Sequence, residues 1–137
     1  MKINYWLMKS EPSTWSWENQ VKDGVAMWDG VRNYQARNNL MKMQKKDLCF
    51  FYHSVFEKSI VGVVEVVKEF YPDPTDKTGK FVAVDVKTKY KMKKPVTLWE
   101  IKNNSRLNNI ALIKQSRLSV MPISKLEWHV IKKISEK

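Results

Sequence analysis

The side chains best suited to chemistry are aromatic and polar residues that cluster around one turn. Trp28 stands directly before Asp29-Gly30, a dipeptide that favours a turn. Arg32, Asn33 and Tyr34 follow shortly afterwards. An indole ring offers a stacking face, and a nearby amide can read the donors and acceptors on the edge of a planar ligand. The pattern predicts a site for a planar polar ligand, although Trp28 fits the hydrophobic core equally well.

Residues that could perform catalysis are few. The chain has two histidines, His53 and His129, and a single cysteine, Cys49. It contains no Cys/His cluster, nucleophile elbow, Walker phosphate loop or dinucleotide fingerprint, so we expect no metal and no cofactor. His53-Ser54 could pair with an acid such as Glu11, but a polar pair at a strand end is more often a hydrogen-bonded support or a ligand contact. We therefore expect no catalytic residue.

Charge is distributed unevenly along the chain, whose formal net charge is +11. Residues 1–86 hold 12 Lys and Arg against 11 Asp and Glu, whereas residues 87–137 hold 13 against 3. If the second part forms one face, the protein has a positive side that attracts polyanions, of which nucleic acid is the usual one. The alternative is that the charge serves only solubility, in a module that binds another partner.

A lysine-rich strand lies at the junction of these two parts. From Phe81 to Met92 apolar and polar residues alternate with a period of two, which predicts a strand with one buried face. The lysines on its other face, and the one that follows, are Lys87, Lys89, Lys91, Lys93 and Lys94. They could form a ridge that contacts phosphates, or the solvated face of an edge strand, where lysine discourages pairing with other chains. The two interpretations are compatible.

Other elements must position these residues. Strands are predicted at 3–9, 48–53, 60–70 and 118–123, in addition to 81–92. Helices are predicted from 13 or 16 to about 21 and at 33–43, and capping boxes at 97–100 and 124–127 begin two more. Several strands that can pair as hairpins, with short helices between them, predict an α+β fold. We expect a mixed or antiparallel β-barrel flanked by short helices.

Four positions within these elements are expected to serve structure. Trp99 and Trp128 on short helices should pack inside, and Cys49 in an apolar run should be a buried strand residue rather than a reactive thiol. Gly62 inside a β-branched strand marks a bulge or a close approach of another group to the backbone.

Length and composition limit the remaining possibilities. A chain of 137 residues with 43% hydrophobic and 28% charged residues fits one globular domain, spanning 1–137. The sequence shows no signal peptide and no stretch of about 18 apolar residues, so we expect no membrane segment. A lone cysteine favours a reducing compartment. We expect a cytoplasmic monomer.

Eight stretches of the chain form one recognisable series. They are YWLMKSEP (5–12), WDGVRNYQARNN (28–39), DLCFFYHS (47–54), IVGVVEVV (60–67), YPDPT (71–75), FVAVD (81–85), PVTL (95–98) and QSRLSV (115–120). In this order they resemble the EVE domain family, a branch of the PUA-like superfold. The resemblance implies a curved β-sheet or barrel flanked by helices, and a pocket suited to a modified base in DNA or RNA.

The resemblance also implies which residues form that pocket. They are Lys9, Ser10, Glu11, Trp28, Arg32, Asn33, Tyr34, Tyr52, His53, Ser54, Gln115, Arg117 and Ser119. We expect Trp28 to stack on a base turned out of its helix, while Ser10, Glu11 and Asn33 read the base edge. The expected function is non-catalytic binding of DNA or RNA. The alternative is a small nucleic-acid-processing hydrolase or nuclease of the related ASCH type.

Overall fold

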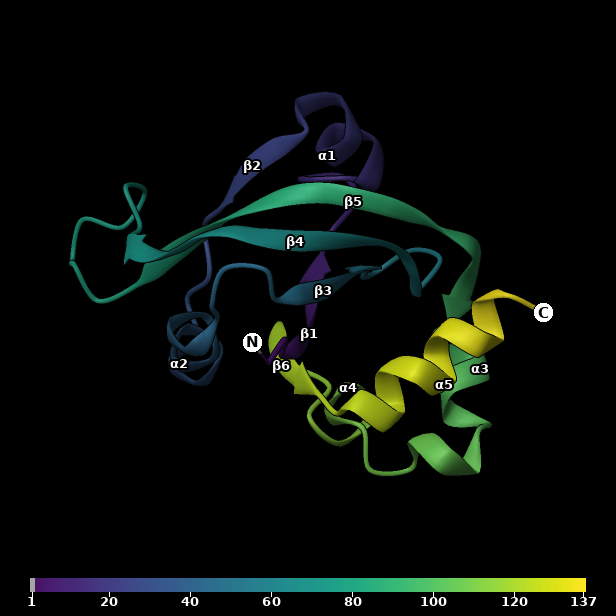
Figure 1. The fold of residues 1–137 in the computed structure, drawn as a ribbon. Helices are drawn as coiled ribbons and strands as arrows, with labels where there is room; N and C mark the ends of the chain where they lie inside the picture. Colours follow the sequence, from purple (N-terminus) through teal and green to yellow (C-terminus); the bar gives the residue numbers. More distant parts are fainter. Residues whose placement is uncertain (1) are drawn as a thin grey trace.

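The computed structural model describes residues 2–137, and within them the chain forms a mixed α+β fold (Figure 1). The strands are β1 (Tyr5–Ser10), β2 (Val25–Trp28), β3 (Leu48–His53), β4 (Ser59–Pro72), β5 (Val82–Thr97) and β6 (Val120–Ile123). The helices are α1 (Trp17–Asp23), α2 (Tyr34–Lys42), α3 (Leu98–Lys102), α4 (Ala111–Lys114) and α5 (Lys125–Ser135), with a 3-10 turn η1 (Ser105–Leu107). Strand β2, η1 and α4 were not predicted, because three or four residues carry too little periodicity.

The helix starts follow local side-chain chemistry. Capping boxes begin α1 at Ser16, α3 at Thr97 and α5 at Ser124, and the Asn33 side chain accepts a hydrogen bond from the Ala36 N–H at the start of α2. The capping boxes predicted at 97–100 and 124–127 are confirmed. None of the helices within residues 2–137 is long and apolar enough to cross a membrane.

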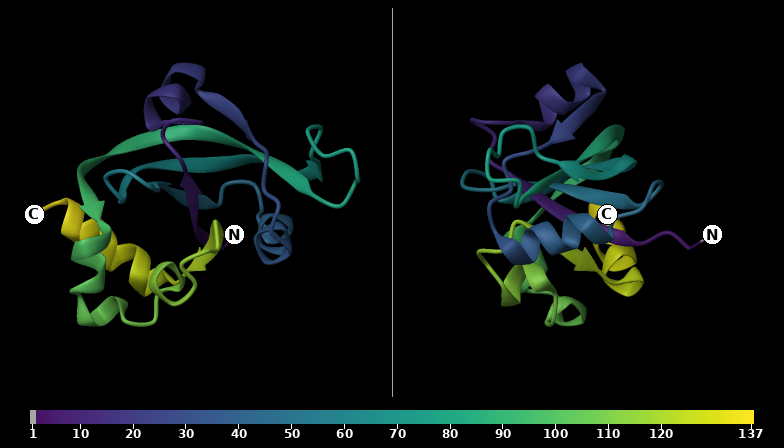
Figure 2. Two further views of the ribbon diagram at one scale, coloured as in Figure 1. Left: turned by 180° about the vertical axis from the view of Figure 1, so that it is seen from behind. Right: turned by 90° about the vertical axis from the view of Figure 1, so that its left-hand side faces the viewer.

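The six strands form one sheet in the order β2-β5-β4-β3-β1-β6. Strands β1 and β3 run parallel, and all the other neighbours are antiparallel. The long strands β4 and β5 arch over the molecule, with α1 and β2 outside the arch and α3, α4 and α5 beneath it (Figures 1 and 2). The sheet is therefore mixed and strongly curved.

The sheet does not close, so the expectation of a β-barrel is wrong. Within the described residues, the four-residue strand β2 pairs only with β5, and the four-residue strand β6 pairs only with β1. A barrel needs continuous pairing around the ring. Helix α2 lies between the two sheet ends instead: it contacts β5 and β6, and the Asn39 side chain donates to the Val120 carbonyl at 2.7 Å.

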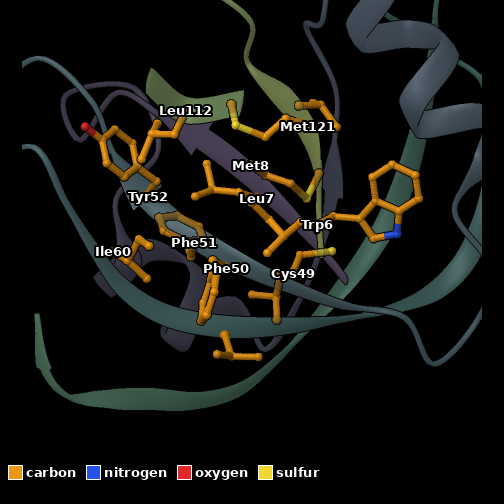
Figure 3. Packing of buried hydrophobic residues seen from close by; sticks show 14 of the residues in the cluster. Trp6, Leu7, Met8, Cys49, Phe50, Phe51, Tyr52, Ile60, Leu112 and Met121 are labelled. Carbon is orange, nitrogen blue, oxygen red and sulfur yellow. The ribbon is translucent and has the colours of Figure 1, made fainter. Parts of the chain in front are cut away.

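Large apolar side chains pack on both faces of the sheet, and Figure 3 shows part of this core. The Trp128 ring from α5 stacks on Phe50 of β3 with ring centroids 3.8 Å apart, and Cys49 beside it is fully buried, as predicted. Burial and the nearby Asp47 carboxylate raise the pKa of the Cys49 thiol. Trp99, in contrast, is 73% exposed, so the prediction that it packs inside is wrong. The short helix α3 buries Ile101 and turns the Trp99 side of the helix to solvent.

Gly62 of β4 makes room for a side chain of helix α1. The Trp17 ring of α1 lies directly on it, so a β-carbon at position 62 would come within 2.3 Å of that ring. Pairing is also irregular here, between Ile60 and Gly62 on the β5 side. Both features predicted from the glycine, a bulge and a close approach, are confirmed. Because Trp17 also packs edge-on against Phe51 of β3, this contact fixes α1 against the sheet.

A buried carboxylate joins two distant loops. Asp73, after β4, accepts hydrogen bonds from the Gly30 N–H at 2.8 Å, from Arg32 at 3.0 Å, and from the N–H and hydroxyl of Thr75. Burial would raise the pKa of Asp73, but these hydrogen bonds outweigh it and lower the pKa below its ordinary value of 3.8. Gly30 adopts a φ of 79°, which glycine tolerates, in the irregular segment between β2 and α2.

We predict that Gly62→Ala destabilises the fold by about 1–3 kcal/mol, because the added methyl group forces the Trp17 ring off its site. Urea unfolding measures the change. In a Trp17→Leu background the same substitution should cost clearly less, since the obstructing ring is gone. An equal cost in both backgrounds would show that the contact with Trp17 is not the reason for glycine.

We predict that Asp73→Asn lowers the free energy of unfolding by about 1–3 kcal/mol at pH 7, because an amide cannot accept all of these hydrogen bonds. The folded-state pKa lies below 3.8, so the contribution of Asp73 is complete above that pH and is lost as the pH falls through the folded value. Urea midpoints of the two proteins should converge below pH 3.8. A gap that stays constant into the acid range would contradict this assignment.

Candidate functional site

A cavity of about 670 Å³ opens where β1 leaves the sheet. Its wall comes from the end of β1, the β1–α1 turn, β2, the β2–α2 loop and Ser119 just before β6. Backbone hydrogen bonds bring these segments together: the Lys9 N–H donates to the Ser119 carbonyl, and the Ser54 N–H donates to the Ser10 carbonyl, both at 2.9 Å. The volume lies within the range of small-molecule sites and can hold a nucleobase with its sugar.

Six of the predicted pocket residues line this cavity. They are Lys9, Ser10, Glu11, Trp28, Arg32 and Ser119. They come from three separate segments of the chain: the β1–β6 pairing brings Ser119 beside the end of β1, and the β2–β5 pairing positions Trp28. The other predicted residues, Asn33, Tyr34, Tyr52, His53, Ser54, Gln115 and Arg117, do not line it.

Two tryptophans contribute to the wall. Trp28 is only 8% exposed and packs edge-on against Phe51, so it belongs to the core and to the cavity wall at once. Trp15 is half-buried, and its indole N–H donates to the Gln20 side chain at 3.1 Å. The Ser10 hydroxyl donates to the Trp15 carbonyl, which ties the turn to the end of β1. Both tryptophans thus contribute to the wall of the cavity.

The charged groups at the cavity differ in whether they already have a partner within the protein. Arg32 is held by Asp73 at 3.0 Å and by the Thr75 hydroxyl at 2.9 Å, so its charge is already paired and it shapes the β2–α2 loop. Lys9 donates to the Ser116 carbonyl at 2.7 Å, and burial together with the nearby Lys58 lowers its pKa. Glu11 is exposed and accepts from the Ser13 hydroxyl. Asp29 is also exposed at the rim.

Asn33 and Tyr34 have structural partners outside the cavity. The Asn33 side-chain oxygen caps α2 by accepting from the Ala36 N–H at 2.9 Å. The Tyr34 ring stacks on Phe81 with centroids 5.2 Å apart. The Arg37 guanidinium lies 4.8 Å from the Tyr34 ring on the same surface. The amide predicted to read a ligand therefore holds a helix end.

Tyr52, His53 and Ser54 lie at the end of β3, beside the main cavity. Tyr52 and Ser54 line a separate small cavity of about 150 Å³, which shares Lys9 with the main one. Figure 3 shows the Tyr52 ring next to Leu112, and burial raises the pKa of Tyr52 to about 12. The His53 Nε2 accepts from the Trp17 N–H at 3.0 Å. Burial lowers the pKa of His53 despite nearby Glu57 and Glu18, so the ring is neutral and serves as an acceptor at pH 7.

The predicted residues from the second half of the chain lie on exposed turns and strands. Gln115 and Arg117 are exposed in the turn after α4, while Ser119 reaches the main cavity. All five lysines of the β5 series, Lys87, Lys89, Lys91, Lys93 and Lys94, are exposed. Lys89 pairs with Glu65 at 3.1 Å, and the Lys94 ammonium lies 3.9 Å from Glu100. Strand β2 covers β5 only along residues 84–87, so the segment beyond has the free edge that suits lysine.

Several cavity residues were absent from the sequence prediction. They are Thr14, Trp15, Asp23, Val25, Ala26, Met27, Asp29, Gly30 and Val31. Most belong to β2 and its flanks, which no periodic pattern marked. A signal existed for Trp15: it stands beside Ser10-Glu-Pro-Ser13, which breaks the first strand. Among residues 2–137, no group of three or more His, Cys, Asp or Glu is arranged to hold a metal ion.

Comparison with known proteins agrees with this architecture. An NMR structure of a Rhodopseudomonas palustris protein is 48% identical, with a TM-score of 0.92, over 98% of this chain and 94% of that one. Mouse thymocyte nuclear protein 1 is 35% identical over 97% of this chain and 74% of its own length. The crystal structure of human THYN1 protein in complex with DNA containing 5-methylcytosine is 34% identical, with a TM-score of 0.86, over 98% of both chains.

The family assignment rests on the sequence as well as on these structures. The EVE domain model matches residues 4–134, which include every segment that forms the cavity. The open curved sheet with its flanking helices is the PUA-like arrangement shared with these structural neighbours. The chain belongs to the EVE domain family.

Proposed function

We propose that this protein binds nucleic acid without catalysis and holds one base, turned out of its stack, in the cavity beside Trp15 and Trp28. The observation that carries the proposal is the cavity itself, which has room for a nucleoside, two tryptophans in its wall and a polar rim. The human relative in complex with 5-methylcytosine DNA, at 34% identity, supports the same class of ligand.

The rim offers groups that suit the edge of a cytosine-type base. Exposed carboxylates at Glu11 and Asp29 can accept a hydrogen bond from an exocyclic amine. The Lys9 N–H and the Ser10 hydroxyl are engaged within the protein, so they shape the wall more than they read the base. Reading therefore falls mainly to the two carboxylates, which face solvent and can be desolvated by a ligand.

The energetics favour bases that leave their stack easily. Extruding a base from a duplex costs a few kcal/mol, and stacking on an aromatic ring returns about 1–3 kcal/mol. Burial of a single methyl group contributes about 0.8 kcal/mol, which is roughly a fourfold change in affinity. We infer that unmodified duplex DNA binds weakly. Larger discrimination for a methylated base requires that the unmodified base leave a cavity or a polar group unsatisfied.

His53, the histidine first considered for catalysis, acts as a support. His53 already accepts a hydrogen bond from the Trp17 backbone, and within residues 2–137 no hydrogen bond joins it to Glu11. A general base has to be free to take a proton from a substrate. Incubation with DNA, RNA and modified nucleosides should therefore release no product, and turnover that disappears in His53→Ala would overturn the non-catalytic assignment.

We predict that Ala26→Phe abolishes specific binding to a single-stranded oligonucleotide with one 5-methylcytosine, because the ring fills the cavity that Ala26 lines. An aromatic residue suits a strand position, so the fold should persist. Trp15→Ala should weaken binding roughly 5- to 150-fold through the loss of about 1–3 kcal/mol of stacking. Fluorescence anisotropy measures both changes.

The matched control is Val21→Phe, which adds the same ring on the exposed face of α1 outside the cavity. It should bind like the wild type. Tryptophan-to-alanine substitution at position 28 is a poor test, because Trp28 is buried against Phe51 and its removal costs about 3–5 kcal/mol of stability. If Ala26→Phe binds as tightly as Val21→Phe, the cavity is not the base site.

We predict that the β5 lysines contribute to nucleic-acid binding through long-range electrostatic attraction. Replacing Lys87 and Lys91 by Gln, neither of which has an ion-pair partner within the described residues, should lower the association rate and leave discrimination for the modified base unchanged. Stopped-flow kinetics at several salt concentrations measures this. An unchanged association rate would indicate that these lysines form only the solvated face of an edge strand.

A further inference from the structure

The most exposed aromatic side chains in the described part of the chain lie together at one end of the sheet. Trp99 of α3 is 73% exposed, and Phe56 in the β3–β4 turn is 68% exposed. The Leu98 N–H donates to the Lys58 carbonyl at 2.9 Å, which joins α3 to that turn. Trp99 lines a surface groove of about 720 Å³, and Phe56 stands between two other groove residues, Val55 and Glu57. Such exposure is costly unless a ligand covers it.

This groove adjoins a small cavity, which in turn adjoins the base cavity. The groove and the small cavity beside Tyr52 share Val55, Lys58 and Leu98, and the small cavity and the base cavity share Lys9. The three hollows therefore form a row that runs from Trp28 past Lys9 and Lys58 to Trp99. A ligand that fills the first hollow and extends beyond it meets the other two.

Two lysines occupy the middle of the row. Lys9 is held in place by its hydrogen bond to the Ser116 carbonyl, and Lys58 lines the same small cavity; burial, and after it the charge of Lys58, lower the pKa of Lys9. Neither ammonium forms an ion pair within the described residues, although Glu57 borders the groove. Lys102 adds a third positive charge at the far side. Like charges held together without a carboxylate between them suit a bridging phosphate.

We propose that the groove holds the nucleotide next to the base in the cavity, with Trp99 stacked on its base and Lys9 and Lys58 on the phosphate between the two. The proposal rests on the proposed function and extends it from one base to a short single-stranded track. An exposed tryptophan could also bind a protein partner. The adjoining lysines, and the wall residues that link the groove through the small cavity to the base cavity, favour nucleic acid, because flat stacking surfaces beside basic grooves are how proteins follow a single strand.

The first test asks whether Trp99 contacts the base next to the 5-methylcytosine. Two single-stranded oligonucleotides carry one 5-methylcytosine, and in the second both neighbouring nucleotides are abasic. Trp99→Ala should weaken binding of the intact strand roughly 5- to 150-fold and leave binding of the abasic strand unchanged. Leu126→Ala, which removes an exposed apolar side chain on α5 outside the row, is the control and should change neither. Trp99 is exposed, so thermal unfolding should be unaffected.

The second test addresses the phosphate. Lys58→Gln should weaken binding of both oligonucleotides about tenfold and reduce the magnitude of the log–log salt slope by about 0.7, the value for one phosphate on a single strand. Lys45→Gln removes the same charge from the turn before β3, which borders none of the three hollows, and should leave the slope nearly unchanged.

The outcomes separate this proposal from the function on which it rests. If Ala26→Phe loses binding while Trp99→Ala and Lys58→Gln behave like their controls, the base cavity stands and the extended track is wrong. If Ala26→Phe binds normally, the base site itself is wrong and the track loses its basis. A Trp99→Ala protein that binds both strands normally, but no longer binds a protein partner, would assign the groove to that partner instead.

Discussion

The parallel pairing of β1 with β3 is the constraint on which the rest of this structure depends. Two parallel neighbouring strands need a crossover connection that returns the chain to the end of the sheet at which the first strand began. In this protein the crossover spans residues 11–47. The crossover contains α1, β2 and α2, and it supplies most of the wall of the base cavity. The cavity lies where the crossover begins, at the carboxyl end of β1, because there the chain leaves the sheet.

Buried polar contacts hold the crossover in place. Asp73 fixes its middle through Gly30 and Arg32, and His53 fixes the start of α1 through the Trp17 N–H. Asp47 fixes its end by accepting hydrogen bonds from the Trp6 indole at 3.0 Å and from the Gln44 N–H at 2.9 Å. Each group would be costly to bury alone, and each gains a partner only in the correct fold. His53, which the sequence offered as a possible catalytic group, thus serves as a support.

Attraction and specificity are assigned to different parts of the chain. The positive excess lies after residue 86, where exposed lysines on β5 give a general field for polyanions. The base cavity draws nearly all of its wall from the near-neutral first half, with Glu11 and Asp29 at its rim. In the extended track, Lys9 and Lys58 of the first half meet Trp99 of the second. In the proposed binding mode, a strand attracted by the basic part is therefore sorted by a surface with little net charge.

The sequence by itself determined the features that depend on neighbours along the chain. Capping boxes set the starts of α3 and α5, alternation marked β5, and Gly62 signalled a close approach that proved to be the Trp17 ring. The tertiary structure alone decided which side chains meet across space. The four-residue strand β2 became a cavity wall because β5, far from it along the chain, offers it an edge. Trp99 stayed exposed because Ile101 fills the only face that the short helix α3 turns inward. Local patterns contain no information on these contacts, which arise from chain segments far apart in sequence.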